Sequence, residues 1–127
     1  SVDFEKVNGR WVPFCTVVGE NDKDNLTRFR SWKKTWNIEY VFPEKLQFDG
    51  VKNLNIEFID GRPIEIHLRT GNDAFWDLST GESLYPVWKD EGIEPDIPNH
   101  YPESFKYSAD GHLSDIRVGY SLTKPSK

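Results

Sequence analysis

The sequence predicts an α+β fold, in which an antiparallel sheet of hairpins packs against one main helix. Two observations predict it. Three Asn-Gly or Asp-Gly pairs each stand between two strand-like runs, which is the pattern of tight β-hairpins. Between the first two pairs lies a polar stretch whose larger side chains have helical spacing. A chain of 127 residues fits one domain with its own core, so we expect a single domain over residues 1–127.

The three predicted hairpins are defined by their glycine turns. Asn8-Gly9 separates VDFEKV from RWVPFCTVV, and Asp60-Gly61 separates LNIEFI from RPIEIHL. Asp110-Gly111 separates SFKYSA from HLSDIRVGYSL. Asn or Asp followed by Gly tolerates the positive φ angles of a two-residue hairpin turn, so each pair predicts a reversal of the chain.

The main helix is predicted within residues 20–40, ENDKDNLTRFRSWKKTWNIEY. Four of its longer side chains fall at helical spacing: Leu26, Phe29, Lys33 and Trp36. Asp22 or Asp24 can cap the N-terminus, and the lysines gather toward the C-terminal end, where the helix dipole favours cations. These features predict one helix of about three turns.

Two further segments follow the predicted helix. The segment FPEKLQFDGVKN offers a possible short second helix from Pro43, although Gly50 weakens that pattern. Residues 79–104, STGESLYPVWKDEGIEPDIPNHYPES, carry four prolines and two glycines and predict a long irregular loop. A loop of this length in a compact domain is usually functional or mobile.

Composition excludes several classes of partner. The net charge of −5 argues against a nucleic-acid backbone. No run approaches the roughly 20 apolar residues of a membrane span, and no signal peptide appears. The single cysteine, Cys15 in VPFCTVV, predicts a buried core thiol and a reducing, cytoplasmic location. The chain has no methionine, from which we expect a processed protein or a part of a longer one.

The central hairpin, residues 53–69, separates apolar from polar side chains. Its polar face is expected to hold Asn55, Glu57, Glu65, His67 and Arg69. A two-residue loop would set Glu57 opposite Ile64 and mix the two faces, because cross-strand partners share a face. A three-residue loop, Ile59-Asp60-Gly61, sets Asn55 opposite Glu65 with Glu57 as the diagonal neighbour. This register brings the two carboxylates within reach of one cation.

Neighbouring carboxylates repel unless a hard divalent cation lies between them or one of them is protonated. The pattern therefore allows a metal site at Glu57 and Glu65. The alternative is that these residues are the solvated side of a half-buried hairpin, with Arg69 paired to a glutamate. Surface hairpins carry charges routinely, so the pattern by itself favours this alternative.

The stretch NIEFIDGRPIEIHLR resembles the metal-binding end of the ATP-grasp superfamily, as in biotin carboxylase and its relatives. In that family a strand ending in Glu-Phe turns into a second strand with the pattern E-x-N-x-R. The resemblance is close over residues 53–73 and looser over residues 3–75. It implies that Glu57 and Glu65 hold magnesium ions on the phosphates of ATP.

The same resemblance implies roles for three more residues. His67 stands at the position of the family's asparagine, and Arg69 stands at that of the arginine that contacts substrate. Imidazole is a better ligand for manganese or zinc than for magnesium, so His67 either binds the metal or contacts the cofactor's phosphate. Asn72, in the following TGND, can supply an amide oxygen to the cofactor.

The function implied by the resemblance is the C-terminal catalytic lobe of an ATP-grasp ligase, with the fold of that lobe. Such a ligase uses ATP and magnesium or manganese to activate a carboxylate as an acyl phosphate, which then passes to an amine. The expected ligands are a nucleotide and a small-molecule carboxylate, and the expected partner is the N-terminal lobe of the same fold. The chain has no candidate for that lobe's Gly-rich phosphate loop, so we expect it to be inactive alone.

The alternative function is a non-catalytic, β-rich binding module. Trp76, Tyr85 and Trp88 lie beside polar groups in TGNDAFWD and YPVWKDEG. Exposed rings in such surroundings can stack on a sugar or pack against a protein partner. Aromatic filling of a small core explains the same residues equally well.

Overall fold

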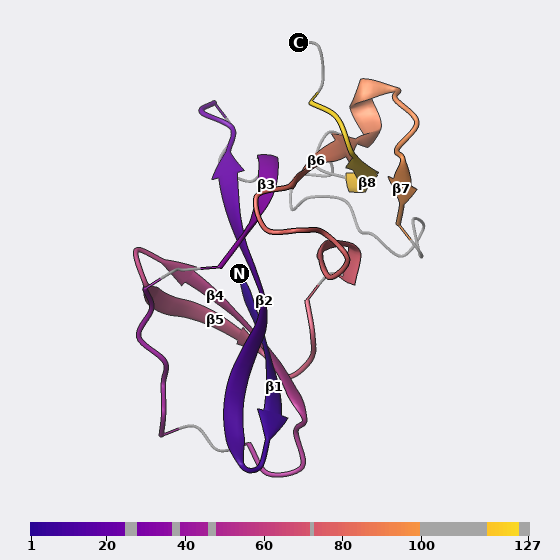
Figure 1. Ribbon diagram of the computed structural model, residues 1–127. Coiled ribbons are helices and arrows are strands. Elements are labelled where there is room, and N and C mark those ends of the chain that lie inside the picture. The colour runs from indigo at the N-terminus through magenta and orange to yellow at the C-terminus, as the bar shows by residue number, and fades with distance from the viewer. Residues whose placement is uncertain (25–27, 37–38, 46–47, 72, 100–116, 125–127) are drawn as a thin grey trace. The chain divides into compact units, whose positions relative to one another are not determined.

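The computed structural model describes residues 1–24, 28–36, 39–45, 48–71, 73–99 and 117–124. These residues form eight strands and two short 3-10 helices (Figure 1). The strands are β1 (Val2–Val7), β2 (Arg10–Asn21), β3 (Phe29–Thr35), β4 (Asn53–Ile59), β5 (Arg62–His67), β6 (Ser83–Trp88), β7 (Ile97–Pro98) and β8 (Arg117–Ser121). The 3-10 helices are η1 (Asp73–Phe75) and η2 (Lys89–Glu91). The strands form one antiparallel sheet in the order β5-β4-β1-β2-β3-β6-β8-β7.

The described fold is nearly all β, so the predicted α+β class with one main helix is wrong. The segment expected to be helical contains the end of β2 and the whole of β3. Lys33 and Trp36, two members of the proposed helical stripe, are exposed. No helix within the described ranges is long and apolar enough to cross a membrane.

Contacts that are distant in the sequence explain why β3 is extended. β3 pairs with β6 through Trp32 opposite Leu84, a partner far along the chain. The Phe29 and Trp32 rings stack with their centroids 4.4 Å apart, directly over Gly19 of β2. A Cβ atom at Gly19 would lie 2.7 Å from the Phe29 ring, so this packing needs the glycine. Helical spacing is a weak predictor when such tertiary contacts favour a strand.

Two other expected segments differ from the prediction. The described residues between Pro43 and Gly50 form turns or irregular structure, and Phe48 and Gly50 both have positive φ angles, so these described residues form no second helix. The segment 79–104 is not an irregular loop, because its described part contains β6, η2 and β7. Pro98 fits a strand here because β7 is an edge strand and a sheet edge tolerates a missing N–H donor, whereas Pro86 lies in β6, between β3 and β8.

The chain divides into two compact units. Unit 1 comprises Ser1–Val18 and Lys34–Gly81, and unit 2 comprises Gly19–Lys33 and Glu82–Lys127. Both β2 and β3 contribute residues to each unit. The central hairpin, β4 and β5, belongs to unit 1, whereas β6, β7 and β8 belong to unit 2.

Unit 1 is built on two hairpins that lie side by side through β1 and β4 (Figure 1). The predicted turn at Asn8-Gly9 is confirmed: both residues have positive φ, 50° and 78°, and Val7 pairs with Arg10. The core is made of four fully buried side chains: Val2, Phe4, Leu54 and Ile56. Aromatic rings from the segment between β3 and β4 pack around Phe4, with Tyr40 at 5.7 Å and Phe42 at 5.1 Å between ring centroids.

Unit 2 buries Leu84, Val87 and Tyr120 on strands β6 and β8. β8 pairs with β6 on one side and with β7 on the other. Gly119 lies so close to the carbonyl of Ile97 that a Cβ atom would overlap the oxygen, which permits the β7–β8 pairing. The third predicted turn, Asp110-Gly111, lies outside the described residues.

Candidate metal centre

The β4–β5 hairpin reverses through a two-residue turn. Asp60 and Gly61 have φ angles of 51° and 76°, and Ile59 pairs with Arg62. Two successive positive φ angles define a type I′ turn, which matches the right-handed twist of the flanking strands. The hairpin at Asp60-Gly61 is therefore confirmed, but the three-residue loop predicted for it is wrong.

A β-bulge accommodates the shorter turn. Phe58 pairs with Pro63 while Glu57 pairs with Glu65, so Ile64 is an extra residue in β5. The alternation of apolar and polar residues predicts that Ile64 shares the buried face with Ile66. That prediction is wrong, because Ile64 is 58% exposed. The bulge restores the pairing of apolar with apolar side chains, because Ile56 then stands opposite Ile66.

The bulge changes the predicted cross-strand pairs, but it still brings Glu57 and Glu65 together. Asn55 lies opposite His67 rather than Glu65, and Glu57 lies directly opposite Glu65 rather than on a diagonal. Direct partners are closer than diagonal ones, so the carboxylates converge more than the predicted register allowed. One ligand atom from each of Glu57, Glu65 and His67 lies within 4.8 Å of the others. The His67 Nε2 atom is 3.6 Å from the Glu65 Oε1 atom.

The electrostatics of this cluster favour binding of a positive charge. Glu57 and His67 are half-buried, and Glu65 is exposed. Burial raises the pKa of Glu57, and a hydrogen bond with Glu65 together with the charge of Glu65 raises that pKa further. Glu57 thus holds a proton more readily than an isolated glutamate does. A cation bound between Glu57 and Glu65 would take the place of that proton.

The donor set indicates which cation fits. Two carboxylate oxygens suit magnesium, manganese and zinc, whereas the imidazole nitrogen of His67 selects against magnesium. A histidine nitrogen as the third ligand is typical of manganese or zinc sites. Three protein ligands also leave coordination positions for water or a ligand oxygen, which is the arrangement of catalytic rather than structural sites.

The other predicted site residues lie differently. β5 ends at His67, and Arg69 lies beyond it with an exposed guanidinium whose Nη1 atom donates to the Thr70 carbonyl at 2.9 Å. Asn72 lies outside the described residues.

Comparisons with known proteins found no match to a family model, to a curated protein or to a solved structure. The resemblance to the ATP-grasp superfamily therefore stays a prediction from the quoted residues. The geometry of the cluster of Glu57, Glu65 and His67 does not depend on that resemblance.

Sequence reasoning missed the residue that organises this part of unit 1, Asp3. Asp3 is buried, 4% exposed, and pairs with Asn55 across β1 and β4. Its carboxylate accepts hydrogen bonds from Asn55 Nδ2 at 2.8 Å, Gly71 N at 2.6 Å and Trp76 Nε1 at 3.1 Å. Asn55 is consequently buried rather than part of an open polar face. The available signal was a carboxylate between two apolar residues, Val2 and Phe4, in VDFEKV.

The facing carboxylates predict a pH-dependent stability. The folded-state pKa of Glu57 is raised, so the folded protein binds more protons than the unfolded chain at pH values above the ordinary glutamate pKa. Stability from this pair is thus present at low pH and is lost as pH rises through the folded-state pKa. In metal-free buffer, we expect Glu57→Gln to increase the free energy of unfolding by about 0.5 kcal/mol near neutral pH, after allowance for solvent screening.

Urea unfolding at about pH 4 and about pH 7 measures this difference. The gain in the free energy of unfolding of Glu57→Gln should be largest at the higher pH and small at the lower one. Glu44→Gln, an exposed residue of unit 1, is the matched control and should change stability equally at both. Loss of stability in Glu57→Gln at the higher pH would show that the two carboxylates do not repel.

Proposed function

We propose that unit 1 binds a divalent cation of the manganese or zinc class on the β4–β5 hairpin. Glu57, Glu65 and His67 are the protein ligands. The observation that carries the proposal is the convergence of one donor atom from each of them within 4.8 Å. The raised pKa of Glu57 supports it, since the pair gains from a neighbouring positive charge.

We further propose that the bound cation presents the phosphates of a nucleotide. Three protein ligands leave positions that phosphate oxygens can occupy, and a metal ion there offsets charge as a phosphoryl group transfers. Arg69 has guanidinium donors beyond the one bonded to Thr70, and these can hold an anion such as a carboxylate or acyl phosphate. The reaction named by the sequence resemblance is ATP-dependent activation of a carboxylate. The described residues of the segment predicted to be that lobe's helix form strands instead, so this part of the proposal depends on the hairpin alone.

Titration with manganese tests the metal site directly. Paramagnetic broadening of backbone amide signals should be centred on β4 and β5, and isothermal titration should give the affinity. We expect Glu57→Gln and Glu65→Gln each to weaken binding about tenfold, which corresponds to about 1.4 kcal/mol. Glu44→Gln should bind as the wild type does. Broadening spread over other acidic surfaces, or equal affinity in all four proteins, would contradict the proposal.

A non-hydrolysable ATP analogue separates the metal site from the nucleotide role. With manganese present, the analogue should bind the wild type, and Arg69→Gln should weaken analogue binding without changing manganese affinity. Binding of manganese but not of the analogue would remove the nucleotide role and leave the metal site. Binding of the analogue in the absence of metal would contradict the proposed bridging by the cation.

A further inference from the structure

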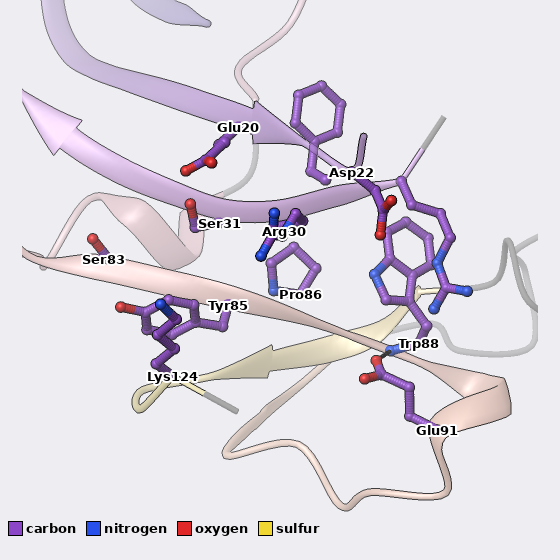
Figure 2. Close-up of a pocket in the computed structure, with 12 residues that line it drawn as sticks. Glu20, Asp22, Arg30, Ser31, Ser83, Tyr85, Pro86, Trp88, Glu91 and Lys124 are labelled. Carbon is purple, nitrogen blue, oxygen red and sulfur yellow. Dashed lines mark hydrogen bonds between the residues drawn. The ribbon is translucent and has the colours of Figure 1, made fainter. Parts of the chain in front are cut away.

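Unit 2 contains a pocket that is separate from the β4–β5 hairpin. It has a volume of about 440 Å³ and is lined by residues from the end of β2, the start of β3, and β6 with the turn that follows (Figure 2). This volume lies in the range of small-molecule sites, which is about 300–1,000 Å³. All of its lining residues belong to unit 2. We call it the unit 2 pocket.

The charges that line the unit 2 pocket cancel. The acidic residues are Glu20, Asp22 and Glu91, and the basic residues are Arg28, Arg30 and Lys124. Figure 2 shows Arg30 between Glu20 and Asp22, so the two kinds are not gathered at opposite ends. A strongly charged ligand would therefore meet groups of both signs.

One end of the pocket is held in place by contacts within unit 2. The Arg28 guanidinium forms a bidentate pair with Asp90, with both N–O distances at 3.1 Å, and lies 4.9 Å from the centroid of the Trp88 ring. The Trp88 backbone N–H donates to Glu91 Oε1 at 2.7 Å. These contacts fix the Trp88 ring in advance of any ligand, which reduces the entropy cost of binding.

The other end offers groups that remain open to a ligand. Arg30 and Lys124 form no ion pair within the described part of the chain. Ser31, Ser83 and Tyr85 bring hydroxyl groups, and Tyr85 also brings a half-buried ring. Figure 2 shows Ser83, Tyr85 and Lys124 on the same side of the pocket.

We propose that the unit 2 pocket binds a neutral mono- or disaccharide. Every sugar hydroxyl both donates and accepts hydrogen bonds, so it is best matched by carboxylates that only accept, guanidinium groups that only donate, and hydroxyls that do both. The unit 2 pocket interleaves all three types. The apolar C–H face of a sugar ring packs on an aromatic ring, and Tyr85 provides such a ring, since Arg28 already covers one face of Trp88.

Other small ligands match this lining less well. The phosphates of a nucleotide would lie beside Glu20, Asp22 and Glu91, and a metal ion would lie beside Arg28, Arg30 and Lys124. A free amino acid needs its positive and negative partners at two separate places, whereas here they alternate. The mixture of both charge signs together with the hydroxyl groups thus favours a sugar.

Amide NMR spectra of the full chain test the proposal. The probes are methyl glucoside, methyl mannoside, N-acetylglucosamine, cellobiose and maltose, with glycine and magnesium-ATP as charged comparators. At least one sugar should shift the Trp88 indole signal and the amide signals of β6, with a dissociation constant in the millimolar range, about 4 kcal/mol of binding free energy.

Tyr85→Ala and Arg30→Gln should each weaken the binding of that sugar about fivefold. Arg62→Gln, an exposed residue of unit 1, is the matched control and should bind the sugar as the wild type does.

Several results would overturn the proposal. One is that no sugar of the panel shifts signals of the pocket, and another is that glycine or magnesium-ATP shifts them instead. A third is that a sugar binds the wild type, Tyr85→Ala and Arg30→Gln equally. Arg30 is exposed, so its variant should keep the dispersed spectrum of the folded chain even where Tyr85→Ala does not. Manganese binding to unit 1 is read from different signals, so either proposal can fail without the other.

Discussion

Replacing Asp3 with alanine is expected to lower the free energy of unfolding by about 3–4 kcal/mol. The Asp3 carboxylate is buried and accepts hydrogen bonds from Asn55, the backbone of Gly71 and the Trp76 indole. Hydrogen bonds to a charged group contribute about 1.5–3 kcal/mol each, and their contributions overlap when they share one acceptor. Alanine would leave the buried amide of Asn55 without this acceptor, which adds to the loss.

Urea unfolding followed by tryptophan fluorescence measures the effect of this substitution. Asp3→Asn keeps the shape and one carbonyl acceptor, so we expect a loss of about 2 kcal/mol. Glu5→Ala is the matched control, because Glu5 lies on the same strand with an exposed side chain. A loss below about 1 kcal/mol in Asp3→Ala would show that the network does not hold β1, β4 and the segment after β5 together.

The native Cys15 thiol is expected to react with Ellman's reagent at least about 100-fold more slowly than the same thiol in the unfolded chain. Cys15 is 4% exposed. Burial raises the pKa of the thiol, an effect that the charge of Lys34 opposes and that of Asp3 strengthens. The reactive thiolate is thus both scarce and shielded from the reagent.

The same reaction reports on the opening of unit 1. The reference rate is that of the chain in concentrated guanidinium chloride, corrected for the effect of the denaturant on a free thiol. Asp3→Ala should accelerate labelling, because reagent access requires opening and opening becomes more frequent as stability falls. Labelling of native Cys15 within about tenfold of the unfolded rate would contradict its placement in the core.

The turns and the approach of Glu57 to Glu65 could be predicted, because the sequence features that indicate them lie within a few residues of each other. Asn8-Gly9 and Asp60-Gly61 have positive φ angles at both positions, and each connects strands in the structure. The buried state of Cys15 followed from the apolar run around it. The meeting of Glu57 and Glu65 was predicted from the demand that apolar side chains share a face, although the register assumed for it was wrong.

The register differed because two local solutions satisfy the same hydrophobic pattern. A three-residue loop and a two-residue turn with one bulged residue both keep Ile56 among apolar partners. The structure uses the bulge, with Ile64 turned out to solvent. The alternation of apolar and polar residues fits both solutions and therefore does not distinguish them.

The sequence by itself determined two of the reversals, a core thiol and the pair of glutamates, since each depends on neighbours a few residues away. Only the tertiary structure decided that β3 is a strand, because its partner Leu84 and the space over Gly19 come from elsewhere in the chain. It also assembled the Asp3 network from β1, β4 and the segment after β5. Hydrogen bonds and packing between distant residues outweigh local helical preference, which contributes only a few tenths of a kcal/mol per residue.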